Sequence, residues 1–148
     1  MWENEISTDI GAPVEDAYRY LADFPRHKEW SVGVAEMAPV GDGHVGVGSE
    51  FAASETVPMK FASRARVVAL EPFRHIAWEA TDGRLMRVEW ALELSPAGGG
   101  THLVERSRWR PRNALGGAML RLWRTRRIPY ENRQSLERLK AILEAGAA

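Results

Sequence analysis

The chain has 148 residues, of which 45% are hydrophobic and 27% charged, and its 20 basic and 20 acidic side chains give a net charge of zero. This length fits one domain with its own core, and a neutral balance argues against a dedicated nucleic-acid binder. The absence of cysteine excludes disulfides, thiolate metal sites and a cysteine nucleophile. The acidic start of the chain is unlike a signal peptide, and no apolar run approaches the ~20 residues that span a bilayer. We therefore expect a single domain over residues 1–148, located in the cytoplasm.

The first 30 residues predict one strand and two short helices. Residues 3–10 alternate as a strand that ends at Gly11. Residues 13–22 follow as a helix, because Pro13 suits a first helical turn, two acids follow it, and the apolar positions share one face. The sequence Asp23-Phe24-Pro25 ends this helix, so residues 26–30 can form only a short second one.

Strands and turns alternate from residue 34 to residue 110. We expect six strands, at residues 34–40, 49–57, 61–70, 75–80, 84–95 and 101–110. The alternation is clearest in the fifth of them, where Met86, Val88, Trp90 and Leu92 share one parity and charged residues take the other. The last two strands are joined by residues 96–100 as a hairpin loop. With the first strand this makes an antiparallel sheet of about seven strands, whose apolar face must be covered.

The C-terminal region predicts the cover. Asn113 can cap a helix, and apolar residues recur at helical spacing before and after Pro129. Proline lacks an N–H and collides with the carbonyl four residues back. We therefore expect either one long helix with a bend near residues 125–129, or two helices.

Five sequence motifs occur in order along nearly the whole chain. They are Ile10-x-Ala12-Pro13-x-Glu15-x-x-Tyr18-x-Tyr20-Leu21-x-Asp23, Arg26-His27-x-Glu29-Trp30, Gly46-x-Gly48-Ser49-x-Phe51, Glu71-Pro72-x-x-x-Ile76-x-Trp78 and Gly98-Gly99-Gly100-Thr101-x-Leu103. Together they resemble the START-like superfamily, also called SRPBCC or birch-pollen-allergen-like, and within it the bacterial polyketide cyclase/dehydrase-type branch. The resemblance implies an α+β helix-grip fold. In that fold a curved antiparallel sheet of about seven strands surrounds a long C-terminal helix, two short helices follow the first strand, and an apolar cavity lies between sheet and helix.

The resemblance does not fix the activity, because the superfamily includes aromatase/cyclases, quinone-binding proteins, lipid carriers and hormone receptors. Our leading hypothesis is that the cavity binds a small apolar, aromatic or polycyclic ligand of polyketide or lipid type. Aromatic side chains of inward parity suit such a ligand, although core packing would also explain each of them. The candidate ligand-binding residues are Trp30, Phe51, Phe61, Trp78, Met86, Trp90, Trp109, Met119 and Trp123.

Catalytic candidates are few, so a polyketide cyclase or aromatase is the alternative hypothesis. Glu105 is the one carboxylate that shares inward parity with apolar neighbours, and a buried carboxyl group can transfer protons. A salt bridge or an outward bulge would explain it equally. Tyr130, near the expected cavity mouth, is the second candidate. The four histidines show no metal-ligand spacing, so neither a metal nor a cofactor is expected.

A block of arginines supports a third hypothesis. Residues 106–127 hold eight arginines and no acid, whereas residues 1–55 hold 11 acids and 3 bases. The block either faces acidic groups of the same molecule or docks weakly on an anionic membrane surface or protein. The helix bend beside it could gate the cavity or have no role. Ligand identity, catalysis and oligomeric state stay open at this stage.

Overall fold

The computed structural model describes residues 1–56, 60–81 and 84–147, and within them the chain forms one seven-stranded antiparallel sheet. The strand order is β1-β7-β6-β5-β4-β3-β2. The strands are β1 (Trp2–Ile10), β2 (Val34–Pro39), β3 (Glu50–Glu55), β4 (Phe61–Glu71), β5 (His75–Thr81), β6 (Met86–Ala97) and β7 (Gly100–Pro111). All seven lie where the sequence predicts them, although Val57 of the strand expected at residues 49–57, and residues 82–83 between two expected strands, lie outside the described residues.

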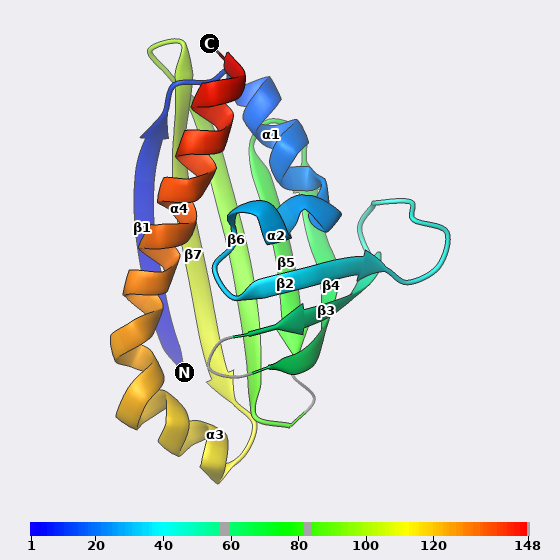
Figure 1. Ribbon diagram of the computed structural model, residues 1–148, viewed down its shortest axis with the longest axis vertical. Helices are drawn as coiled ribbons and strands as arrows, with labels where there is room; N and C mark the ends of the chain where they lie inside the picture. Colours follow the sequence, from blue (N-terminus) through cyan, green and yellow to red (C-terminus); the bar gives the residue numbers. More distant parts are fainter. Residues whose placement is uncertain (57–59, 82–83, 148) are drawn as a thin grey trace.

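The helices connect and cover this sheet. They are α1 (Val14–Ala22), the 3₁₀ turn η1 (Phe24–Arg26), α2 (His27–Trp30), α3 (Ala114–Met119), the π-helical turn η2 (Leu120–Arg124) and α4 (Thr125–Ala147). Figure 1 shows α4 running along the sheet, with α1 beside its C-terminal end and α2 beside its middle. Since β1 and β2 are the two edge strands, α1 and α2 carry the chain from one edge to the other. The expected α+β helix-grip fold is confirmed.

The sheet keeps a regular alternation of inward and outward side chains, and shifts in the register between strands make it curve. Met86, Val88, Leu92 and Leu94 of β6 are all buried on the face toward the helix, as their period of two predicts. The β4–β5 register shifts between Val67 and Ala69, and the β2–β3 register shifts near the start of β2. Such bulges increase twist and bend the strand, so the sheet wraps around what it covers.

The β6–β7 hairpin is tighter than the sequence predicts. The loop expected at residues 96–100 is only Gly98 and Gly99, because Ala97 pairs directly with Gly100. Both glycines have positive φ, 57° and 84°, which favours the two-residue hairpin turn that continues the strand twist. The two strands therefore extend farther than expected.

The C-terminal helix follows the first of the two expected alternatives. Asn113 caps it by accepting a hydrogen bond from the Gly116 N–H (2.8 Å), and helical turns then continue without a break to Ala147, passing through Pro129. The irregularity is η2, which precedes Pro129. Because π-helical turns bend helices, α3 points away from the axis of α4 (Figure 1).

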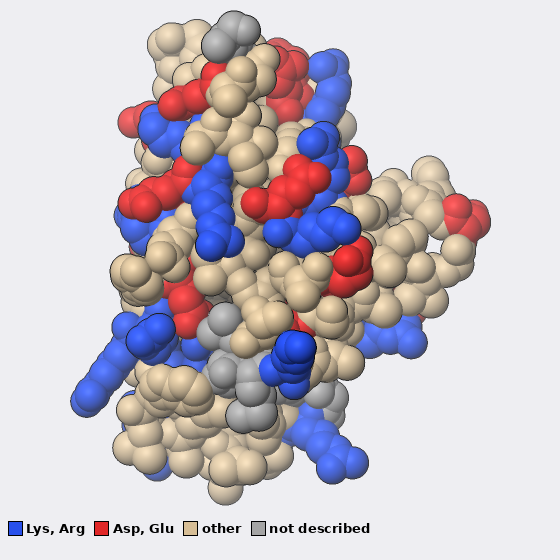
Figure 2. Space-filling view, viewed as in Figure 1, with Lys and Arg blue, Asp and Glu red and all other residues tan. Residues whose placement is uncertain are grey.

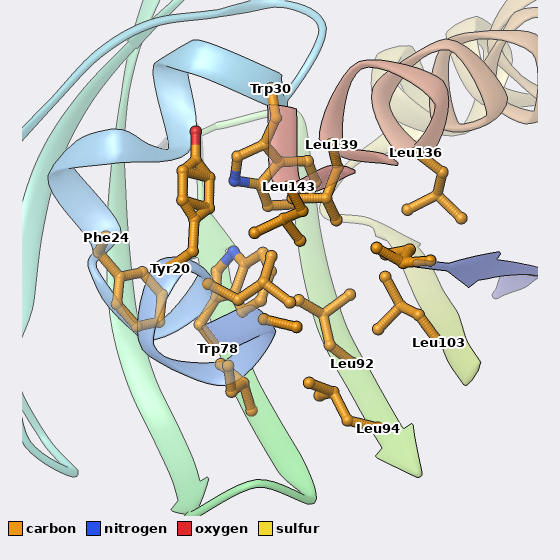
Figure 3. Close-up of a cluster of buried hydrophobic side chains, with 14 of the residues drawn as sticks. Tyr20, Phe24, Trp30, Trp78, Leu92, Leu94, Leu103, Leu136, Leu139 and Leu143 are labelled. Atoms are coloured by element: carbon orange, nitrogen blue, oxygen red, sulfur yellow. The ribbon is translucent and has the colours of Figure 1, made fainter. Parts of the chain in front are cut away.

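Two apolar clusters hold helix and sheet together. In the larger, Leu136, Leu139 and Leu143 of α4 point toward leucines of β6 and β7, with α1 and α2 closing the side (Figure 3). The smaller joins Leu120 and Ile128 to the start of β6. Trp90 packs against both clusters, and the space beside it is not filled by either.

Candidate functional site

A cavity of about 580 Å³ lies between the concave face of the sheet, α2 and the helix from α3 to α4. Strands β2 to β7 all contribute side chains to its wall. Its volume is in the range of sites for small molecules. The curved sheet and the helices together form the cavity, so its shape does not depend on a single loop.

A row of three tryptophans forms the sheet side of the cavity. Trp78 and Trp90 are direct cross-strand partners whose rings stack with centroids 6.1 Å apart and planes 15° apart. Trp109 meets Trp90 edge to face at 5.8 Å. Strand alternation places all three on the inward face, because Trp90 and Trp109 share parity with buried neighbours. The row presents flat apolar surface to the cavity.

Most of the candidate ligand-binding residues line this cavity. Those that do are Trp30, Phe61, Trp78, Met86, Trp90, Trp109 and Met119. Phe51 does not: it is 1% exposed and stacks on Phe24 in the core, with centroids 5.2 Å apart.

Trp123 does not line the cavity either, since it is 44% exposed. Trp123 follows Met119 by four residues, a spacing that puts two residues on one face only in a regular α-helix. The π-helical turn η2 contains one residue more per turn, so the inward position after Met119 passes to Arg124.

Glu105 of β7 points into the cavity, as its parity predicts. It is 2% exposed and pairs in register with Ile6 and Leu92 of the neighbouring strands. Burial raises the pKa of its carboxyl group to about 8, an effect that the positive charge of Arg133 only partly opposes. Glu105 is therefore mainly protonated at pH 7 and can donate a hydrogen bond or a proton.

Tyr130 lies away from Glu105, on the outer side of α4. It is 60% exposed, and its hydroxyl group accepts a hydrogen bond from Gln134 Nε2 (3.0 Å). The neighbouring residues Ile128 and Glu131 take the inward positions. The structure thus does not bring the two catalytic candidates together.

His27 is a wall residue that the sequence did not identify. It is 1% exposed and lies between the rings of Phe24 (4.5 Å) and Trp78 (5.0 Å). Its Nε2 lies 2.8 Å from the carbonyl oxygen of Leu21, which can only accept, so Nε2 carries the proton. Burial lowers the pKa of the imidazole to about 4, which keeps it neutral. Only the resemblance motif Arg26-His27-x-Glu29-Trp30 pointed to this position.

An ion pair between Arg124 and Glu131 is a second feature that the sequence missed. The two terminal guanidinium nitrogens, Nη1 and Nη2, each donate to one carboxylate oxygen at 2.8 Å, and the two side chains are 6% and 12% exposed. The guanidinium group also lies over the ring of Trp109, 5.8 Å from its centroid. The pair joins η2 to α4 across Pro129 and forms part of the cavity wall.

Three buried polar atoms of the cavity wall have no hydrogen-bond partner among the described residues. They are Trp30 Nε1, Ser63 Oγ and Glu105 Oε1. Each such group costs about 1–3 kcal/mol while it is unsatisfied. No cluster of three potential metal ligands occurs in the described part of the chain.

Six of the eight arginines of the block fall into two groups. On the outer face of β7, Arg106, Arg108 and Arg110 pair with glutamates of β1 and β6, for example Arg108 with Glu3 at 2.7 Å. These three therefore face acidic groups of the same molecule, which is the first of the expected explanations. Arg121, Arg126 and Arg127 lie on the helix and are exposed.

Comparisons with known proteins agree with this architecture. The model of the family described as polyketide cyclase / dehydrase and lipid transport matches residues 1–144. No curated protein matches the sequence. None of the described helices is long and apolar enough to cross a membrane.

Several solved structures share the fold. The Zhui aromatase/cyclase from Streptomyces sp. R1128 is 14% identical, with a TM-score of 0.79 over 99% of this chain and 96% of that one. The di-domain aromatase/cyclase StfQ from the steffimycin biosynthetic pathway is 20% identical, with a TM-score of 0.76 over 98% of this chain and 51% of that one. Protein TTHA0849 from Thermus thermophilus is 18% identical, with a TM-score of 0.77 over 99% of this chain and 100% of that one. At these identities the likeness is one of fold.

Proposed function

The chain belongs to the polyketide cyclase / dehydrase and lipid transport family, and from this premise we propose that it binds a small, largely apolar aromatic or polycyclic ligand in the cavity between sheet and helix. The observation that carries the proposal is the combination of the tryptophan row with three buried, unpartnered polar atoms on residues that line the same cavity. An apolar wall alone favours any hydrophobic molecule, whereas the polar atoms favour a ligand that carries oxygen-containing groups.

The polar atoms define the ligand's chemistry further. The indole N–H of Trp30 is a donor, so it calls for an acceptor such as a carbonyl or hydroxyl oxygen. The protonated carboxyl group of Glu105 can donate one hydrogen bond and accept others. The hydroxyl group of Ser63 can donate or accept. A flat ligand with keto or hydroxyl groups would stack on the tryptophan row and satisfy these atoms.

The test is a panel of polycyclic ketones, quinones, phenols and fatty acids, followed by tryptophan fluorescence and thermal unfolding. A ligand at 100 times its dissociation constant should stabilise the fold by about 2.7 kcal/mol. Trp90→Leu should weaken binding at least tenfold, because Trp90 is the centre of the row. Trp123→Leu is the matched control, since Trp123 lies outside the cavity. Absence of any thermal shift across the panel would contradict the proposal.

The buried Glu105 carboxyl group favours a second candidate function, a cyclase or dehydratase acting on a poly-β-keto substrate. A neutral acid beside the tryptophan row could protonate a substrate carbonyl during ring closure, or a hydroxyl group that leaves as water. Glu105→Gln should then keep affinity within a few-fold while turnover falls on the order of 10²–10⁴. If the protein only binds, the same change alters affinity or stability and no turnover is observed with either protein.

A further inference from the structure

The helix that closes the cavity carries an exposed apolar surface on its outer side. Leu115 is 67% exposed, Leu122 69%, Trp123 44% and Tyr130 60%. All four lie within the 16 residues from α3 to the start of α4. We refer to these four residues, with Arg121, Arg126 and Arg127, as the mouth surface. So many large apolar side chains on one short segment mark an interaction site.

The charge of the mouth surface has one sign. Arg121, Arg126 and Arg127 are exposed, and no ion pair joins them to any residue that the structure describes. No acid occurs from residue 106 to residue 130, and Glu131, the next one, is held by Arg124. In Figure 2 the end of the molecule over α3 is tan and blue, while acidic residues lie farther up. The surface is therefore complementary to a negatively charged partner.

The inner side of the same segment belongs to the cavity. Met119 and Arg124 line the cavity, while Leu122 and Trp123 face outward. One helical segment thus separates the cavity from whatever the mouth surface contacts.

We propose that the mouth surface docks the protein on an anionic lipid bilayer, with Leu115, Leu122 and Trp123 in the interface and the three arginines at the phosphate level. Helices that lie in a membrane interface combine leucine and tryptophan with flanking basic residues in this way. The α3 segment also protrudes at one end of the molecule, so a flat surface can reach it (Figure 1). Docking goes beyond ligand binding and does not depend on it.

The charge arm of the test uses co-sedimentation with vesicles of phosphatidylcholine, either alone or mixed with phosphatidylglycerol, without any cavity ligand. The protein should bind the anionic vesicles at least tenfold more tightly, and binding should fall steeply with salt. Each arginine lost should weaken binding about fivefold. Arg126→Glu and Arg127→Glu together should therefore nearly abolish it. Arg138→Glu is the matched control, because Arg138 is exposed on the same helix about 18 Å farther along.

The apolar arm uses Leu122→Gln, which should weaken vesicle binding roughly tenfold because insertion of an apolar side chain is lost. Val47→Gln is its control, since Val47 is 68% exposed in the connection between β2 and β3. All the substituted side chains are exposed, so unchanged melting temperatures should accompany the loss.

Equal affinity for the two kinds of vesicle, or no binding to either, overturns the proposal. Binding to polyglutamate but not to vesicles, lost in the Arg126 and Arg127 variant, would assign the mouth surface to an acidic protein instead. The ligand panel is measured without vesicles, so failure of docking and failure of ligand binding are separate results.

Discussion

The sharpest test of the site is the pH dependence of stability that Glu105 imposes. The carboxyl group has a pKa near 4.5 when exposed and about 8 in the folded protein, because burial disfavours the charged form. Replacing Glu105 with glutamine keeps the shape of the side chain and removes the ionisation. The substitution therefore isolates the effect of this one proton.

The sign and size follow from proton binding in the two states. Below about pH 4.5 the group is protonated in both the folded and the unfolded chain, and its contribution to the free energy of unfolding is fully present. Between about pH 4.5 and 8 only the unfolded chain is ionised, so that free energy falls by about 1.4 kcal/mol for each pH unit. The total loss is about 5 kcal/mol, and above about pH 8 the contribution stays constant.

The measurement is urea unfolding of the wild type and of Glu105→Gln at pH 5, 6, 7 and 8. The difference, variant minus wild type, should rise with pH by about 1.4 kcal/mol per unit and flatten near pH 8. Burial lowers the pKa of His27 to about 4, so both proteins lose stability as the pH falls below about 6.5, where the histidine is protonated only in the unfolded chain. Subtracting one curve from the other removes this effect. Glu137→Gln, at an exposed position of α4, is the control. Parallel curves for wild type and Glu105→Gln would mean that Glu105 is ionised in the fold, and its role as a neutral donor would be refuted.

Three further tests concern the packing around the site. Trp90→Ala should lower the free energy of unfolding by less than about 3 kcal/mol in urea titrations, because Trp90 borders an open cavity and is not fully packed; a larger loss would mean a filled core. Gly116→Ala should lower stability by roughly 1–3 kcal/mol in thermal unfolding, since the added Cβ would lie 2.1 Å from a carbonyl oxygen, whereas Gly117→Ala has room and should be neutral or stabilising. Arg124→Met should destabilise by about 3–5 kcal/mol by leaving Glu131 buried and unpaired, and adding Glu131→Met should recover most of the loss in a double-mutant cycle.

Strand parity accounts for what the sequence could predict. A period of two puts Trp90 and Glu105 inside once the strands and their inward face are known, and both lie there. The five motifs identified the helix-grip fold and its branch, which the family match over residues 1–144 confirms. These features depend on the local alternation of residue types and on the order of the motifs, and both can be read directly from the sequence.

Helical positions near the π-helical turn could not be predicted in the same way. A single extra residue per turn moves Trp123 outward and Arg124 inward, and the spacing of the apolar residues does not indicate a π-helical turn. The position of His27 depends on how a four-residue helix sits against Trp78, a contact between segments 51 residues apart. Such contacts are set by tertiary packing, so periodicity carries no signal for them.

The arrangement of the cavity explains why ligand binding and stability should be coupled in this protein. The unpartnered atoms of Trp30, Ser63 and Glu105 each lower the stability of the folded state, and so does the open space beside Trp90. A ligand that supplies hydrogen-bonding oxygens and a flat ring system removes several of these costs at once, and it has no comparable site in the unfolded chain. Ligands that have the oxygens but no ring system, or the ring system alone, should each stabilise the fold less than a ligand that has both. Stabilisation measured across such a matched series therefore distinguishes the polar wall atoms from the tryptophan row as the source of affinity.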